Sequence, residues 1–359
     1  MRLLFTALRE FGVGTAIVGF FCMSKEDYFH LNIIAKKVLT LQVGFASFDT
    51  SSREGKKLNS NEIKRVHRYV SNDFTLRAAA VDATHVVREM QTLQGTFPIP
   101  TVAVGRAMVG ALLMSSQLKE GQHIGLYVKG DGPLAAVYAE AQFEGQVRGY
   151  TPNPLYQPTD YKQGLSVKEA IGRGTMTVAR HQPFQKQPFN GTVELVSGEI
   201  GEDIAHYLIQ SHQIRSLVSL GVYLDVYGKV KAAGGVIIEV MPGVEDEVVE
   251  KVEKNAKTHQ FSVSEMLVNG ARPVDLVKPF LEGILFTELD HNYPVIYHCP
   301  CTKDRVVRAL ETLGVAELQD MVDKSEPAKV TCQICGRPYE ITVEEIKKLK
   351  DQLFRDSLN

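Results

Sequence analysis

Cysteine is scarce in this chain, and the charge imbalances and long apolar runs that mark other protein classes are missing. Five Cys in 359 residues are too few for a disulfide scaffold. A formal net charge of −2 argues against general electrostatic binding to nucleic acid or to a membrane surface. The sequence has no Gly-rich nucleotide loop, His-Glu-x-x-His or Gly-x-Ser-x-Gly pattern, so we expect no enzyme. The remaining composition, 44% hydrophobic and 23% charged, is that of a globular protein with two or three domains.

Residues 1–71 are interpreted as an N-terminal extension and linker. Residues 1–22 hold an apolar run that is too short to span a bilayer. A secretory or transit segment is one interpretation, but Glu10 abuts the run and no small-x-small cleavage site follows it. The plainer interpretation is an upstream extension with Met23 as an alternative start. The polar residues 49–67 then read as a linker. We expect a cytoplasmic protein, or an organellar one if residues 1–22 are a transit segment.

Residues 72–241 are expected to form an α+β domain in which helices pack on β-sheets. Leu76–Gln94 and Thr101–Leu118 both have apolar residues at helical spacing. The second contains Arg106 and a Ser-Ser-Gln sequence, which favours a core helix over a membrane span. A third helix is expected over Ile200–His212. Strand-like runs lie at 124–129, 134–141, 175–179, 191–196, 217–226 and 232–241, and the first two read as a hairpin.

Residues 242–298 have the composition of an acidic helical connector. They contain ten Asp and Glu against five Lys and Arg, a local net charge of 5 − 10 = −5. Three short helical patterns are expected, at Val244–Lys257, Val263–Leu267 and Pro273–Leu281. Like charges in one segment repel each other, so this is the most self-repelling part of the chain.

Four of the five cysteines fall within the C-terminal residues 299–359. Cys299 and Cys301 form a C-x-C pair, and Cys332 and Cys335 form a C-x-x-C pair after thirty intervening residues. Zinc prefers four tetrahedral ligands, and thiolate is among its best. Four cysteines leave no open position for a catalytic water, so we predict a structural zinc ion, with His298 as a bystander. A segment as small as residues 299–359 can form only a small hydrophobic core, so zinc would supply much of its folding free energy.

These thiolates also have a redox chemistry. Thiolate is the form of cysteine that oxidants attack, and oxidation of each pair to a local disulfide would release the metal. A disulfide across C-x-C closes a small, strained ring, and strained disulfides are the labile, regulatory kind. The fifth cysteine, Cys22, receives no role.

With these pairs in view, the chain resembles the redox-regulated heat-shock chaperone family of about thirty-three kilodaltons, the chaperonins of bacterial oxidative stress. The four cysteines match that family's zinc motif in type, order and spacing. The likeness covers roughly residues 72–350. Further matching segments are Gly130-Asp131-Gly132-Pro133, the run from Val196 to Asp203, Ala232-Ala233-Gly234-Gly235 and Met241-Pro242-Gly243. One departure is His212, where the family commonly has Glu, so no role is carried over for that position.

The resemblance implies a holdase that is idle when reduced and bound to one zinc ion per chain. Oxidation would form the disulfides Cys299–Cys301 and Cys332–Cys335, release zinc and unfold the metastable connector. The active protein would form a homodimer and bind unfolding client proteins, but neither nucleic acid nor membrane. Clients would bind to surface on the N-terminal domain together with apolar residues of the connector, which are Leu267, Val274, Leu276, Phe280, Leu281, Leu285 and Phe286.

Two other functions are weighed against this one. A nucleic-acid-binding zinc ribbon is common, but residues 299–359 hold ten bases against eleven acids and no basic-aromatic stripe. A dithiol oxidoreductase would use the C-x-x-C pair, but that pair lies outside any βαβ pattern. The chaperone is therefore the favoured interpretation, and the zinc ribbon is its alternative.

Overall fold

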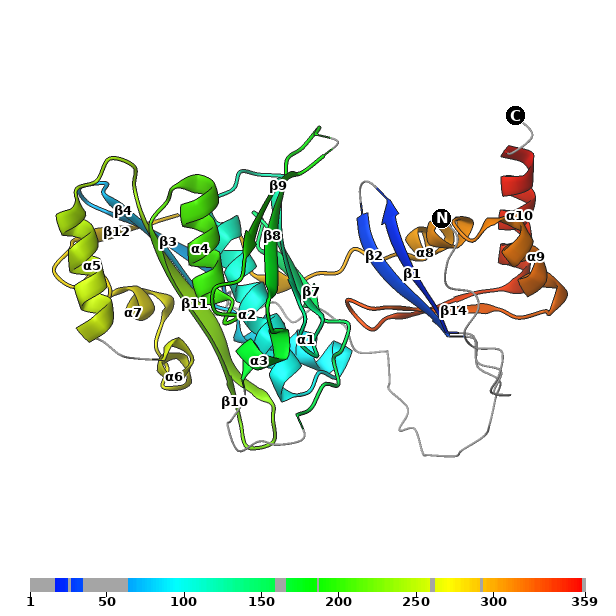
Figure 1. Cartoon of the computed structure of the whole chain (residues 1–359), viewed down its shortest axis with the longest axis horizontal. Coiled ribbons are helices and arrows are strands. Elements are labelled where there is room, and N and C mark those ends of the chain that lie inside the picture. The colour runs from blue at the N-terminus through cyan, green and yellow to red at the C-terminus, as the bar shows by residue number, and fades with distance from the viewer. Residues whose placement is uncertain are drawn as a thin grey trace. The chain divides into compact units, whose positions relative to one another are not determined.

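The computed structural model describes residues 17–24, 27–34, 64–158, 166–185, 187–258, 262–290 and 293–356. The described residues divide into two compact units (Figure 1). The larger lies within Leu58–Cys299, and the smaller combines parts of Met1–Lys57 and Pro300–Asn359. Both units mix helices and strands, which confirms the expected α+β class.

A six-stranded sheet forms one layer of the larger unit. Its order is β13-β7-β6-β5-β8-β9. The predicted hairpin is confirmed, because β5 and β6 pair antiparallel with Leu126 opposite Ala139. Its strands are β5 His123–Gly130, β6 Ala136–Gln142, β7 Gln146–Tyr150, β8 Gly174–His181, β9 Phe189–Glu194 and β13 Ile296–Tyr297.

A five-stranded sheet in the order β10-β11-β4-β3-β12 forms a second layer. Its strands are β3 Val66–Ser71, β4 Leu76–Asp82, β10 Ser216–Leu224, β11 Val230–Val240 and β12 Phe286–Leu289. The prediction of one helix over Leu76–Gln94 is wrong in its first half, since Leu76–Asp82 is β4. Ala79 and Val81 of β4 join one apolar core while Ala78 and Ala80 join another. A strand that is buried on both faces loses the alternation of apolar and polar residues by which strands are recognised.

Helices fill the space between the two sheets. They are α1 Thr84–Gln94, α2 Pro98–Ser115, α3 Val167–Ile171 and α4 Gly201–His212. Helix α2 contacts strands of both sheets, among them β6 and β11. It is long and apolar enough to span a membrane, yet 89% of it is buried inside the protein. This burial agrees with the prediction of a core helix.

The acidic connector packs on the opposite face of the five-stranded sheet (Figure 1). Its helices are α5 Asp246–Thr258, α6 Val263–Val268 and α7 Pro273–Val277. Their apolar side chains form a second core with β4 and β11, in which Leu276 is fully buried. Gly221 of β10 permits close approach, because a Cβ there would lie 2.8 Å from the backbone nitrogen of Ser264 in α6.

Two boundaries differ from the sequence-based expectation. The expected extension over 1–71 includes β3, which pairs with β4 and so belongs to the five-stranded sheet. The expected helical connector over 242–298 ends in the strands β12 and β13, each of which pairs with a sheet of the larger unit. Pairing with distant strands is invisible to local sequence patterns. Residues 1–16, which include most of the suggested targeting segment, lie outside the described residues.

The smaller unit contains the hairpin of β14 Ala328–Cys332 and β15 Pro338–Ile341. Two N-terminal strands, β1 Ile17–Ser24 and β2 Asp27–Ile34, extend its sheet to the order β1-β2-β14-β15. Its helices are α8 Lys303–Glu311, α9 Gly314–Asp323 and α10 Val343–Asp356. Among the described residues, the buried members of its apolar core are Val306, Leu310, Leu318, Ala328, Val330, Ile341, Ile346 and Leu349.

Candidate metal centre

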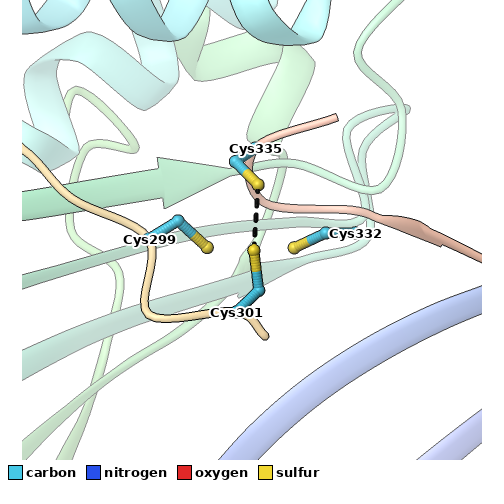
Figure 2. A group of neighbouring side chains, drawn as sticks. All are labelled: Cys299, Cys301, Cys332 and Cys335. Atoms are coloured by element: carbon cyan, nitrogen blue, oxygen red, sulfur yellow. Dashed lines mark hydrogen bonds between the residues drawn. The ribbon is translucent and has the colours of Figure 1, made fainter. Parts of the chain in front are cut away.

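Four cysteine sulfur atoms form one cluster, as Figure 2 shows. The Sγ atoms of Cys299, Cys301, Cys332 and Cys335 all lie within 4.8 Å of one another. The Cys301 and Cys335 sulfurs are 3.3 Å apart. A tetrahedral zinc with Zn–S bonds of about 2.3 Å requires sulfur–sulfur distances of about 3.8 Å, which lies within this range. The donor set therefore fits a tetrahedral thiolate-preferring metal ion.

The local backbone explains how the two pairs present their sulfurs. Cys332 is the last residue of β14, and the Gly336 amide donates to its carbonyl over 2.8 Å. Gly336 has a φ of 69°, the left-handed conformation that glycine adopts without strain. On the other side, Thr302 caps α8 immediately after Cys301. The C-x-x-C pair is thus held in a tight turn at the end of β14, and the C-x-C pair directly precedes α8.

Burial differs among the four thiols. Cys301, Cys332 and Cys335 are buried, with at most 5% of their surface exposed. Cys299 is only partly buried. His298 is exposed and does not belong to the cluster. Solvent and oxidants therefore have their most direct access at Cys299.

Tyr339 and Arg337 support the buried sulfur of Cys301. The Tyr339 hydroxyl is 3.0 Å from Cys301 Sγ and donates a hydrogen bond to it. Burial, and then this bond, raise the pKa of Tyr339 to about 12, so the hydroxyl stays protonated and remains a donor. A hydrogen bond with Tyr339, followed by the charge of Cys301, raises the pKa of Arg337. Such outer contacts orient metal ligands and stabilise their charge.

Arg148 acts on Cys299 from within the larger unit. Strand β13 pairs with β7, and the His298 amide donates to the Val147 carbonyl over 3.0 Å, which brings Cys299 beside β7. Arg148 is buried and donates to Glu140 over 2.8 Å. Burial lowers the pKa of Arg148, but the charge of Glu140 and other nearby groups together raise it by more, so the net shift is upward. The charge of Cys299 also raises the pKa of Arg148. A buried positive charge therefore acts on the most exposed of the four cysteines.

Sequence reasoning identified the four cysteines that the structure brings together but missed Tyr339, Arg337 and Arg148. Arg337 and Tyr339 follow the C-x-x-C pair directly, so their proximity was a usable signal. Arg148 lies far before Cys299 in the sequence, and only the pairing of β13 with β7 brings it near. No local pattern could have identified it.

The residues expected to bind clients lie in different surroundings. Leu276, Phe280 and Leu281 are buried in the connector core, and Leu267 and Phe286 are partly buried against it. Val274 is also partly buried there. Leu285 is 78% exposed. Most of this apolar surface is therefore covered while the connector stays packed.

Comparison with known proteins gives one family. The sequence profile described as "Hsp33 protein" matches residues 64–342. The 33 kDa chaperonin of Thermodesulfovibrio yellowstonii is 38% identical over 280 residues, which are 78% of this chain and 96% of that protein. The 33 kDa chaperonin of Bacillus subtilis is 35% identical over 285 residues, or 79% and 97% of the two chains.

A solved structure agrees with these relatives. The crystal structure of the 33 kDa chaperonin (heat shock protein 33 homolog) from Thermotoga maritima matches with a TM-score of 0.74 and 32% identity. The match covers 81% of this chain and 99% of that one. The relatives carry the name of a chaperone and not of an enzyme. These matches extend the resemblance from the cysteines to most of the chain. The chain therefore belongs to the Hsp33 family of chaperones.

Proposed function

We propose that this chaperone is a redox-switched holdase whose resting state is held by one zinc ion on Cys299, Cys301, Cys332 and Cys335. The observation that carries the proposal is the cluster of four sulfurs within 4.8 Å, one of them partly exposed. Zinc is the metal favoured by four thiolates in tetrahedral geometry. Structural zinc contributes about 10–16 kcal/mol in small peptide sites, which is large beside the small apolar core of this unit.

Activation would proceed by two-electron oxidation of each thiolate pair. A peroxide takes two electrons from two thiolates, its O–O bond breaks, solvent protons complete two water molecules, and one S–S bond forms. The bonds expected are Cys299–Cys301 and Cys332–Cys335. A disulfide sulfur is a poor zinc ligand, so the metal leaves, and the stabilisation that it gave to the resting state is lost.

The connector is the part proposed to open. It is acidic, and α5–α7 are short helices that depend on packing against the sheet for their stability. Opening would uncover Leu267, Leu276, Phe280, Leu281 and Phe286, next to the exposed Leu285. Such surface would bind unfolding proteins and keep them from aggregating. We further propose domain boundaries near residues 241/242 and 298/299, a homodimer in the active state and a cytoplasmic location.

The test combines zinc release with chaperone activity. The protein is treated with hydrogen peroxide at raised temperature, and bound zinc is followed with a metal dye while citrate synthase aggregation is followed by light scattering. We expect zinc release and suppression of aggregation to rise together. Cys22→Ser, a change at the cysteine that belongs to neither the C-x-C nor the C-x-x-C pair, should behave like the wild type, whereas Cys301→Ser should bind zinc poorly. Zinc that stays bound, or equal protection by reduced protein, would contradict the proposal.

A further inference from the structure

One segment of the connector covers an edge of each sheet in the larger unit. We call residues 285–298 the strap; it is described at 285–290 and 293–298. The Asn72 amide donates to the Leu285 carbonyl over 2.9 Å, and β12 then runs antiparallel along β3. Further on, the Val295 amide donates to the Lys64 carbonyl over 2.8 Å, and β13 runs parallel to β7. Without the strap, β3 and β7 would be edge strands, as the strand orders show.

The strap is held by short strands and few buried side chains. Within β12, Phe286 is partly buried and the next three residues are exposed. Phe286 packs edge-on against Tyr69 at 5.6 Å between ring centres. Val295 is buried in the main core, and Tyr297 is partly buried against it. Polar side chains add three contacts: His67 Nδ1 lies 2.6 Å from Glu288 Oε1, the Thr287 hydroxyl donates to Asn72 over 3.0 Å, and His85 Nε2 lies 2.7 Å from the Val295 carbonyl. None of these three contacts is fully buried, and strands of four and two residues make a short attachment.

The metal centre lies at the end of this attachment. Cys299 follows β13 after a single residue, so a metal ion on Cys299 fixes the C-terminal end of the strap. When that ligand is withdrawn, the two-residue strand β13 depends on its hydrogen bonds and on the packing of Val295 and Tyr297. Release of the strap would leave unpaired N–H and C=O groups along β3 and β7.

We propose that the edge of β3 released by the strap, continued by that of β7, binds an extended apolar segment of an unfolding polypeptide as an added strand. The inference rests on the proposed function and specifies where and how the client binds. An unpaired edge is a template for any chain that can extend, and main-chain hydrogen bonds give affinity without demanding one client sequence. The strap itself is the resting occupant, and it shows that this edge accepts a strand.

The state dependence of binding follows from the same geometry. The strands at the far ends of the sheets, β9 and β10, are not covered by the strap in either state. The β3 and β7 edges are the ones whose exposure changes with the metal centre. Client binding there would therefore be absent in the reduced protein and present after oxidation.

Hydrogen exchange at β3 tests this assignment on the unmodified protein. Because the Asn72 amide points to the strap, strand alternation directs the amides of Val70 and Arg68 the same way and that of Tyr69 toward β4. We expect the Val70 and Arg68 amides to exchange fast in the oxidised protein and to become protected again when reduced, carboxymethylated α-lactalbumin is added. Tyr69 should stay protected throughout. Unchanged exchange at Val70 and Arg68 on addition of this client would overturn the proposal.

A second copy of the chain is the competing occupant. If the Val70 and Arg68 amides become protected with rising protein concentration and without any client, the edge serves dimerisation and the proposal is wrong. Protection that depends on the client and not on protein concentration supports it.

A matched pair of variants gives the functional test. Arg68→Pro removes one outward donor while leaving the pairing with β4, and Arg68→Ala removes the side chain but keeps the donor. In the oxidised state, Arg68→Pro should bind the client about three- to tenfold more weakly than Arg68→Ala, the effect of one lost hydrogen bond. Equal affinity in two folded variants contradicts strand addition. If Arg68→Pro does not fold, the exchange experiment decides alone. Failure of the wild type itself to protect clients would instead contradict the holdase function.

Discussion

The hydroxyl of Tyr339 is the smallest part of the metal centre whose removal can be measured cleanly. It donates to Cys301 Sγ over 3.0 Å and to the Cys301 carbonyl over 2.9 Å. We expect Tyr339→Phe to lower zinc affinity about tenfold, the lower end of the range for lost outer-sphere contacts, because the thiolate loses a donor. Competition with a chromophoric chelator measures this. Tyr227→Phe is the control, since Tyr227 is 86% exposed. Equal affinities in the two variants would show that the contact does not stabilise the bound thiolate.

Asp203 organises the loop that precedes helix α4. Its Oδ1 accepts from the amides of Val196 and Ser197, at 2.8 and 3.0 Å, and its Oδ2 accepts from the amide of Ile200 at 3.0 Å. The carboxylate is fully buried and holds the loop that precedes α4.

Replacing Asp203 by Asn places an NH₂ group where at least one backbone amide requires an acceptor. We expect a loss of about 2–3 kcal/mol in the free energy of unfolding, the cost of unsatisfied buried groups. Denaturant unfolding followed by circular dichroism measures it. The neighbouring exposed Glu202, changed to Gln, should lose very little. A similar loss in both variants would mean that the loop does not depend on Asp203.

The helices of the connector depend on contacts that the sheet permits. Helix α6 approaches β10 so closely that an added Cβ at Gly221 would lie 2.8 Å from both the Cβ and the backbone nitrogen of Ser264. Real Cβ atoms do not approach so near, so Gly221→Ala must push α6 away from the sheet.

We therefore expect Gly221→Ala to loosen the connector while zinc stays bound. Amide exchange in α6 should accelerate, and the reduced variant should suppress client aggregation in part. Gly243→Ala, a glycine with no atom within 4 Å of an added Cβ, controls for the general effect of adding a methyl group, although its positive φ adds some strain. Slow α6 exchange in Gly221→Ala would show that the sheet tolerates the added methyl.

Helix α7 contains a charge-dependent cap. Hydrogen bonds from Lys278 and then from Arg272 hold the pKa of Asp275 well below its usual value of 3.8. A lowered pKa stabilises the folded connector above pH 3.8, and this contribution is lost as the pH falls below it.

Asp275→Asn should show that pH dependence. At pH 7 the variant should exchange α7 amides faster than the wild type. The difference should shrink as the pH falls from about 3.8 toward the lowered pKa of the folded wild type, because the carboxylate protonates first in the unfolded chain and only at lower pH in the folded one. Any acid loss of metal affects both proteins and cancels in the comparison. A difference that persists far into the acid range, once the wild-type carboxylate is protonated, would assign the effect to shape instead of charge.

Across the whole chain, the two units should respond differently to metal removal. The smaller unit has a small core, whereas the larger has one extensive core between its sheets and a second under the connector. Chelation under reducing conditions should therefore accelerate amide exchange throughout α8–α10 and leave β5 and β6 protected. Exchange mapped by mass spectrometry checks this. Protection of α8–α10 that survives complete zinc removal would show that the unit folds without metal.

How much of the fold was predictable from the sequence varied from one segment to the next. The β5–β6 hairpin and α2 were predicted because their signals are local. Leu76–Asp82 was mistaken for a helix because Ala-rich strands that are buried on both faces have no alternation. Strands β12 and β13 were missed because their partners β3 and β7 lie in much earlier parts of the sequence.

The sequence by itself determined the set of four cysteines that form the candidate metal centre, and the family. The metal-binding chemistry of the four cysteines follows from their residue type. Members of each pair lie two or three positions apart, so they stay close together in any fold. The tertiary structure decided what surrounds them. It placed Arg148 beside Cys299, buried most apolar side chains of the acidic connector and paired the strap with β3 and β7. Strand pairing and burial bring together residues that are distant in the chain, and no local pattern encodes which of them will meet.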